Sequence, residues 1–158
     1  MLELTRVTAA DPRLDRLLQL YMFEWSARVP TAIGADARYT YRALPRYADA
    51  DDDDAEAYLL RAPGAEAPAG FALVTRDEVG CWHVEEFFVL PGARRRGQGA
   101  HAARALVAAH PGRWSLTVRP ENPPALAFWR RVFPAARADL EPGVDGIVRT
   151  RLTFTAPA

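Results

Sequence analysis

The chain contains no lysine and a single cysteine among its 158 residues. One cysteine excludes an internal disulfide and any metal site built from several cysteines, which suits a reducing compartment. Because lysine is absent, all 20 basic side chains are arginines, and a lysine Schiff base or lysine general base is excluded. The arginine bias and the many alanines are typical of a GC-rich bacterial genome.

The sequence also lacks an excess of charge and a long apolar run. Its 20 basic residues balance 20 acidic ones, which argues against electrostatic capture of nucleic acid or of an anionic membrane. No run approaches the ~20 apolar residues that span a bilayer, and residues 1–6 contain no apolar run of signal-peptide length. We expect a cytoplasmic protein with no nucleic-acid or membrane partner, and the sequence is compatible with a homodimer.

The spacing of apolar residues predicts one α/β domain over residues 1–158. Helical spacing predicts three helices, over residues 12–28, 99–110 and 123–132, with Asp11 and Asn122 as N-caps of the first and the last. Alternating or continuous apolar residues predict six strands, over residues 2–7, 57–60, 70–75, 82–90, 114–118 and 147–154. A turn-rich connection makes the second and third strands a hairpin, whereas the helix between the fourth and fifth strands predicts a parallel crossover.

A basic turn rich in glycine joins the longest predicted strand to the helix that follows it. The turn consists of Arg94, Arg95, Arg96, Gly97, Gln98, Gly99 and Ala100. The first N–H groups of a helix have no partner within it, and glycine lets a phosphate approach them closely. These residues alone leave three interpretations open: a phosphate or nucleotide-cofactor cradle, a solvated turn, or a nucleic-acid-binding tract. The turn is neither a Walker A loop nor a dinucleotide fingerprint.

Two motifs in this part of the chain resemble the GCN5-related N-acetyltransferase (GNAT) superfamily. They are Val89-x-Pro91 followed by Arg94-x-x-Gly97-x-Gly99, and Asn122-x-x-Ala125-x-x-Phe128-Trp129. The first is similar to the family's acetyl-CoA pyrophosphate loop, and the second resembles its N-x-x-A-x-x-F-Y element. The resemblance covers residues 55–133. It implies a single GNAT-like, acyl-CoA-binding domain with a mixed, splayed β-sheet flanked by helices.

The resemblance also implies a site and an activity. Acetyl-CoA would be the co-substrate, with its pyrophosphate on residues 94–100 and its pantetheine along the main chain near Val89 and Leu90. Asn122 would contact the cofactor near its reacting end, and Trp129 would be core packing or a wall beside the cofactor. The implied reaction transfers an acetyl group to a primary amine of a small molecule or peptide. Because Trp129 stands where many relatives carry a tyrosine general acid, a catalytically weak acyl-CoA sensor or interaction module is the alternative.

Acetylation of an amine requires a base, because an amine of pKa ~10 is mostly protonated at pH 7. Regular alternation along residues 82–90 places His83 and Glu85 on one face of the strand and Glu86 on the other. The family resemblance selects Glu85 as the base and His83 as its partner, since some relatives carry a base four residues before the valine of V-x-P. Glu86 is a lesser candidate that we expect to act mainly on stability.

Neither motif specifies the acceptor. The region that relatives use for their substrates contains Glu24, Trp25, Arg28 and residues 38–46, and the last of these mix arginine with tyrosine. This mixture would suit a small molecule with an acidic group, although solvated surface also explains most of these residues. The acidic run at residues 49–54 predicts a solvated loop rather than a metal site, because adjacent carboxylates rarely converge on one ion.

Overall fold

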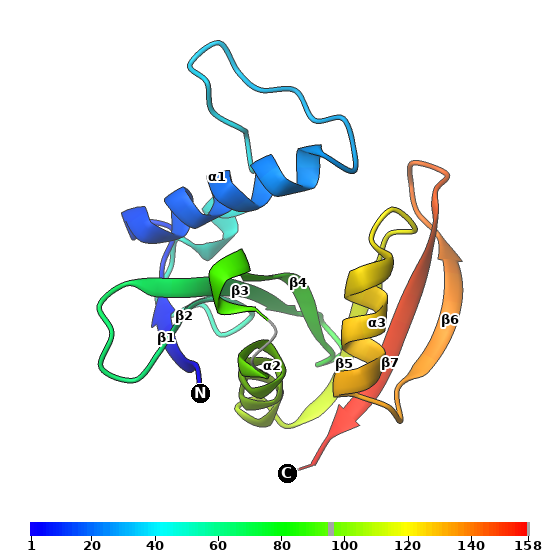
Figure 1. The fold of residues 1–158 in the computed structure, drawn as a ribbon. Helices are drawn as coiled ribbons and strands as arrows, with labels where there is room; N and C mark the ends of the chain where they lie inside the picture. The colour runs from blue at the N-terminus through cyan, green and yellow to red at the C-terminus, as the bar shows by residue number, and fades with distance from the viewer. Residues whose placement is uncertain (95–96, 158) are drawn as a thin grey trace.

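A seven-stranded mixed sheet organises the chain in the computed structural model, which describes residues 1–94 and 97–157 (Figure 1). The elements are β1 (Glu3–Val7), α1 (Pro12–Ser26), η1 (Leu44–Tyr47), β2 (Ala55–Arg61), β3 (Pro68–Arg76), β4 (Trp82–Val89), η2 (Pro91–Ala93), α2 (Gln98–Ala108), β5 (Gly112–Val118), α3 (Pro123–Val132), β6 (Arg137–Pro142) and β7 (Val148–Ala156). The strand order is β1-β2-β3-β4-β5-β7-β6. Among the pairs of the described strands, β4 with β5 is parallel and the others are antiparallel.

The three predicted helices and six predicted strands are confirmed, with ends that differ by at most two residues. The caps are confirmed as well: Asp11 Oδ1 accepts the N–H of Arg13 at 2.9 Å, and Asn122 Oδ1 accepts the N–H of Ala125 at 3.3 Å. Strand β6 is not predicted from the sequence. It is an edge strand whose residues are mostly exposed, so no buried alternation marks it.

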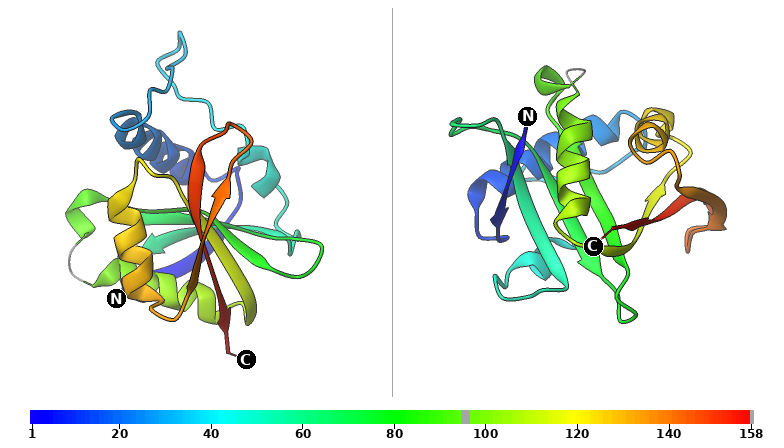
Figure 2. Two further views of the ribbon diagram at one scale, coloured as in Figure 1. Left: turned by 90° about the vertical axis from the view of Figure 1, so that its right-hand side faces the viewer. Right: turned by 90° about the horizontal axis from the view of Figure 1, so that it is seen from below.

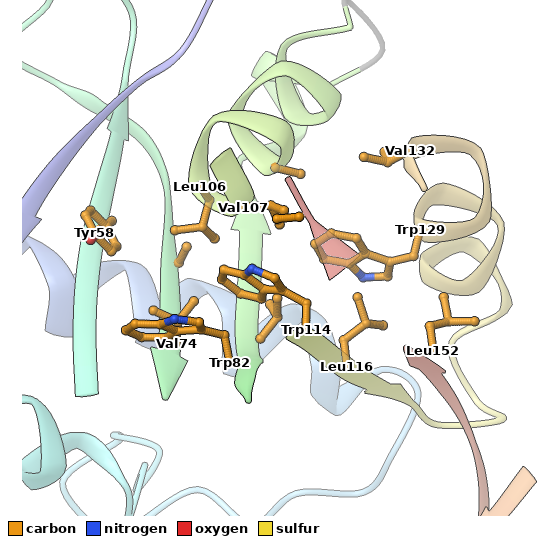
Figure 3. Packing of buried hydrophobic residues seen from close by; sticks show 14 of the residues in the cluster. Tyr58, Val74, Trp82, Leu106, Val107, Trp114, Leu116, Trp129, Val132 and Leu152 are labelled. Carbon is orange, nitrogen blue, oxygen red and sulfur yellow. The ribbon is translucent and has the colours of Figure 1, made fainter. Parts of the chain in front are cut away.

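The helices divide between the two faces of the sheet. Seen from below, α2 lies in front of the sheet and α1 behind it (Figure 2). The α1-side cluster consists of Leu14, Leu17, Leu18, Tyr47, Ala55, Ala57, Leu59, Phe71, Leu73 and Phe88. On the other face, the α2-side cluster joins α2 and α3 to the sheet through Trp82, Val84, Trp114, Leu116, Trp129 and their neighbours (Figure 3). None of the helices in the described ranges is long and apolar enough to cross a membrane.

Strand β4 contains a β-bulge at Glu85. Val74 of β3 pairs with Val84 and Leu73 pairs with Glu86, which leaves Glu85 as an extra residue. In an unbroken strand Val84 and Phe88 would share a face, but Val84 lies in the α2-side cluster and Phe88 in the α1-side cluster. The bulge therefore reverses the alternation halfway along the strand.

Beyond the bulge, β4 also separates from β5. Within the described residues the two strands pair over Trp82–Val84 and diverge after that point. The N–H of Leu90 donates to the carbonyl of Ala69 on the β3 side, so by alternation the backbone groups of Phe87 and Val89 face the open side. The sheet thus offers an unpaired strand edge where β4 and β5 diverge.

Gly70 is required where β3 passes close to this part of β4. A Cβ at Gly70 would lie 2.0 Å from the carbonyl oxygen of Phe88. This is a steric clash, and the backbone of β3 or β4 would have to move to remove it. We expect Gly70→Ala to lower the free energy of unfolding by about 2 kcal/mol or more. Gly92→Ala, where a Cβ meets nothing within 4 Å, is the control and should stay within about 0.5 kcal/mol of the parent. Urea unfolding measures both, and equal midpoints for the two variants would contradict the close approach.

Candidate functional site

A cleft of about 810 Å³ opens beside the edge of β4 that has diverged from β5. Its walls are the C-terminal half of α1, the edge of β4, the first turn of α2, and α3. Of the predicted cofactor-binding residues, those lining it are Val89, Arg94, Gly97, Gly99, Ala100, Asn122 and Trp129. Leu90 packs against the α1-side cluster instead, and Gln98 is not part of the lining. Arg95 and Arg96 lie outside the described residues.

The first turn of α2 has the geometry of an anion site. Gly97 is its N-cap, with a φ of 72° that an L side chain rarely adopts, and a Cβ there would meet nothing within 4 Å. The first N–H groups of α2 are therefore open to an anion in the cleft. Arg28 and Arg131 line the same cleft, and neither has a carboxylate oxygen within 4 Å among the described residues. The cleft is therefore suited to a polyanion.

Arg94 makes several contacts within the protein. Its Nη1 and Nη2 donate to the two carboxylate oxygens of Glu24 on α1, at 3.0 and 2.8 Å, and its Nε donates to the carbonyl of Val89 at 2.6 Å. The guanidinium also lies over the ring of Phe88, with its carbon 5.4 Å from the ring centre. Arg94 thus joins α1 to the open edge of β4. Its side chain is engaged with protein groups rather than directed at a phosphate.

Trp129 and Asn122 form the inner wall of the cleft. Trp129 is buried and points from α3 into the α2-side cluster (Figure 3), where it packs edge-on against Phe87 with ring centres 5.3 Å apart. It is therefore both core packing and a wall. The Oδ1 atom of Asn122 caps α3, so the group that Asn122 can offer to the cleft is its amide Nδ2.

A smaller cavity of about 260 Å³ adjoins the cleft and shares Tyr21, Trp25, Phe87, Asn122, Ala125 and Trp129 with it. We call it the carboxylate compartment, because Glu85 and Glu86 both line it. Thr117 and Arg119, from the end of β5 and the loop after it, close its other side.

The bulge is the reason that two consecutive glutamates share this compartment. Glu85 is exposed and accepts the hydroxyl of Thr75 at 2.8 Å, whereas Glu86 is partly buried and accepts the hydroxyl of Tyr41 at 3.1 Å. The expectation that Glu86 lies on the opposite face from Glu85 is therefore wrong. It rested on regular alternation, which the bulge interrupts.

Glu86 has the electrostatic setting of a base. Burial raises the pKa of its carboxyl to about 7; hydrogen bonds from Tyr21 and Tyr41 oppose the rise, and the negative charge of Glu85 adds to it. Burial also raises the pKa values of Tyr21 and Tyr41, so both hydroxyls stay protonated and able to donate. A carboxylate with a pKa near the working pH is well suited to accept a proton.

His83 lies outside the lining of both cavities as the structure describes them. Its Nδ1 is 2.9 Å from the hydroxyl of Ser115 on the neighbouring strand β5. Burial lowers the pKa of His83, an effect that the charge of Glu85 opposes and that of Arg151 assists. The structure therefore places His83 near Glu85 but not at the compartment.

Several lining residues were not predicted as part of the site. Tyr21 lies on the apolar face of α1, and its spacing identifies a buried face without indicating a cleft. Trp25, four residues later, belongs to the segment that the resemblance assigns to the acceptor, and it lines both cavities. Tyr41 comes from a segment with no periodicity, and no sequence signal places it beside Glu86. Within the described residues, no group of three or more His, Cys, Asp or Glu could hold a metal ion.

Most of the chain matches a known protein family. The model of the acetyltransferase (GNAT) family matches residues 14–133. No curated protein is significantly similar to the chain in sequence.

Solved structures share the fold along nearly the whole chain. An acetyltransferase from Thermus thermophilus superposes with a TM-score of 0.74 at 20% identity, covering 99% of this chain and 97% of that one. The ribosomal-protein-S18-alanine N-acetyltransferase of Escherichia coli gives 0.67 at 14% identity, covering 100% and 96%. Arabidopsis thaliana NAA60 in complex with acetyl-CoA gives 0.67 at 12% identity, covering 98% of each chain. At these identities the likeness is one of fold.

The raised pKa of Glu86 predicts a stability that depends on pH. A glutamate titrates near 4.3 when unfolded and near 7 here, so the folded state holds this proton more tightly. The stabilisation is complete below the unfolded pKa and is lost as the pH rises through 7. The glutamine of the Glu86→Gln variant cannot titrate. The free energy of unfolding of this variant, measured relative to that of the parent, should therefore be about 2–3 kcal/mol higher at pH 8 than at pH 5.

Chemical unfolding at the two pH values measures this difference. Glu78→Gln removes the same charge from the exposed turn between β3 and β4, and it should follow the parent at both pH values. If Glu86→Gln also follows the parent, Glu86 titrates as an ordinary exposed glutamate.

Proposed function

Because the chain belongs to the GNAT acetyltransferase family, we propose that it transfers an acetyl group from acetyl-CoA to a primary amine of a small molecule or peptide. One observation carries the proposal: a cleft suited to a polyanion adjoins a compartment that holds two carboxylates, and the two share six lining residues. The first would bind the acyl donor, and the second would receive the amine.

The cleft fits the parts of acetyl-CoA in order. The N–H groups of the first α2 turn, with Arg28 and Arg131, would bind phosphate groups. The backbone groups of Phe87 and the N–H of Val89, on the edge of β4 that does not pair with β5, would hydrogen-bond the pantetheine amides, as an added strand does. We assign Arg94 to positioning, because its bonds to Glu24 and Val89 hold α1 against that edge.

We assign the proton-accepting role to Glu86 rather than to Glu85. The acceptor arrives as an ammonium ion and gives one proton to the Glu86 carboxylate, whose pKa near 7 matches this task. The nitrogen lone pair then forms a bond to the acetyl carbonyl carbon, the carbon–sulfur bond breaks, and the nitrogen releases its second proton to water as the neutral amide forms. CoA leaves as a thiolate. A thiol of pKa ~8.5 is a fair leaving group, so water can protonate it where Trp129 replaces the usual tyrosine.

Glu85 keeps a place in the proposed site as the charge that attracts and holds the ammonium group. It lines the same compartment and remains more exposed than Glu86. We assign His83 to its bond with Ser115 rather than to proton transfer. A sensor that only binds acyl-CoA would need neither carboxylate, so the pair supports an enzyme over that alternative.

Acetyl-CoA should raise the melting temperature of the protein. A ligand that binds only the folded state, present at 100 times its Kd, adds about 2.7 kcal/mol to the free energy of unfolding.

Gly97→Ala should weaken acetyl-CoA binding about 10-fold or more, since a methyl group enters the open space before α2. Calorimetry measures the affinity. The control is Gly80→Ala on the β3–β4 turn, where φ is 78° and a Cβ is also unobstructed. Both variants should lose about 1–2 kcal/mol of stability to left-handed strain. Parent-like binding by Gly97→Ala would place the phosphate site elsewhere.

The pH–rate profile tests the base. With an accepted amine, kcat/KM should rise with pH through about 7, the pKa of Glu86. Glu86→Gln should lower the rate by about 10²–10⁴-fold and remove this acidic limb, while acetyl-CoA affinity barely changes. Glu85→Gln should retain the limb with a smaller loss of rate. The reverse pattern, with the limb lost in Glu85→Gln and kept in Glu86→Gln, would assign the base to Glu85.

A further inference from the structure

The two cavities differ in the sign of the charge that they leave unpaired. From this difference we infer that the acceptor is a cationic aliphatic amine with no carboxylate near its reacting nitrogen. The inference rests on the proposed acetyl transfer and names the substrate class of the same site.

Within the described part of the chain, the two glutamates of the carboxylate compartment have no cationic partner. Among residues 1–94 and 97–157, no arginine or histidine nitrogen lies within 4 Å of a carboxylate oxygen of Glu85 or Glu86. The hydrogen-bond donors that reach them are neutral hydroxyls, from Thr75 to Glu85 and from Tyr41 and Tyr21 to Glu86. A positive charge on the acceptor would supply the missing partner.

The arginines beside the compartment on the side of β5 and β7 are already paired. Arg119, which lines the compartment, bonds Glu121 at 3.1 Å and Asp145 at 3.0 Å. Beyond it, Arg149 pairs with Asp145 at 2.7 Å, and Arg151 pairs with Glu141 at 3.3 Å. These arginines are therefore not available for an acceptor's carboxylate, and the acidic groups beside them would repel it.

The other described charged groups near Glu85 and Glu86 do not offset the negative charge of the compartment. Burial favours neutral His83. The segment whose arginines suggested an acidic acceptor also contributes no cation here: Arg38 pairs with Asp15, and Arg42 and Arg46 are exposed and outside the lining of both cavities. The acidic-acceptor interpretation of residues 38–46 therefore has no support from the site.

The size and the walls of the compartment also favour a cationic aliphatic amine. At about 260 Å³ it suits a narrow alkyl arm, and Tyr21 and Trp25 provide aromatic walls on the side of α1. Aromatic rings attract ammonium groups through their negative faces. When Glu86 takes the proton from the reacting nitrogen, Glu85 keeps its negative charge, so a carboxylate on the neighbouring carbon would meet repulsion throughout the reaction.

Matched amines that differ by one carboxylate test the inference. The parent protein, saturated with acetyl-CoA, is assayed for thiol release with 1,5-diaminopentane against lysine and with 1,4-diaminobutane against ornithine. We expect kcat/KM to favour the carboxylate-free member of each pair by about 10-fold or more. Glu85→Gln should reduce this preference several-fold, whereas Glu78→Gln, on the exposed β3–β4 turn, should leave it unchanged.

The outcomes separate this inference from the proposed function. Equal or better use of lysine and ornithine overturns the inference and leaves acetyl transfer standing. The inference is also overturned if none of the four amines is acetylated by a protein that acetylates a peptide N-terminus and whose melting temperature rises with acetyl-CoA. No response to acetyl-CoA in a folded sample overturns the proposed function itself.

Discussion

The β-bulge at Glu85 is the constraint on which the rest of the site depends. One extra residue in β4 leaves Val84 facing α2 and turns Glu86 and Phe88 toward α1. The same strand separates from β5 after Val84. The open edge and the paired carboxylates therefore arise within a few residues of each other. A regular strand would place Glu86 on the α2 side, among apolar side chains, where an ionised carboxylate is costly.

The two glutamates show how a short irregularity produces two environments from one residue type. Glu85 remains in contact with solvent and bonds a neutral threonine. Glu86 lies among the hydroxyls of Tyr21 and Tyr41, where burial raises its pKa to about 7. The partial burial of a carboxylate costs stability above neutral pH. Such a cost is expected at a functional site, where local consistency is given up for chemistry.

Part of this arrangement could be predicted from the sequence because the signals are local. The caps Asp11 and Asn122 precede proline-initiated helices, and the glycine-rich basic turn identifies the start of α2. The bulge could not be predicted, because Trp82–Val89 contains no glycine or proline to mark it. The contact between Tyr41 and Glu86 joins residues 45 positions apart, and the bond between Glu24 and Arg94 joins residues 70 apart. Long-range contacts of this kind depend on the assembled fold.

Direct observation of the two carboxyl groups tests the central claim, that the bulge places Glu85 and Glu86 in one compartment. The measurement is a ¹³C NMR titration of their side-chain carboxyl carbons, assigned by comparison with Glu85→Gln and Glu86→Gln. We predict that Glu86 titrates near pH 7 and that its pKa falls in Glu85→Gln, because the neighbouring negative charge is removed. A Glu86 that titrates near 4.3 and does not respond to Glu85→Gln would place the two glutamates on opposite faces of β4 and contradict the account.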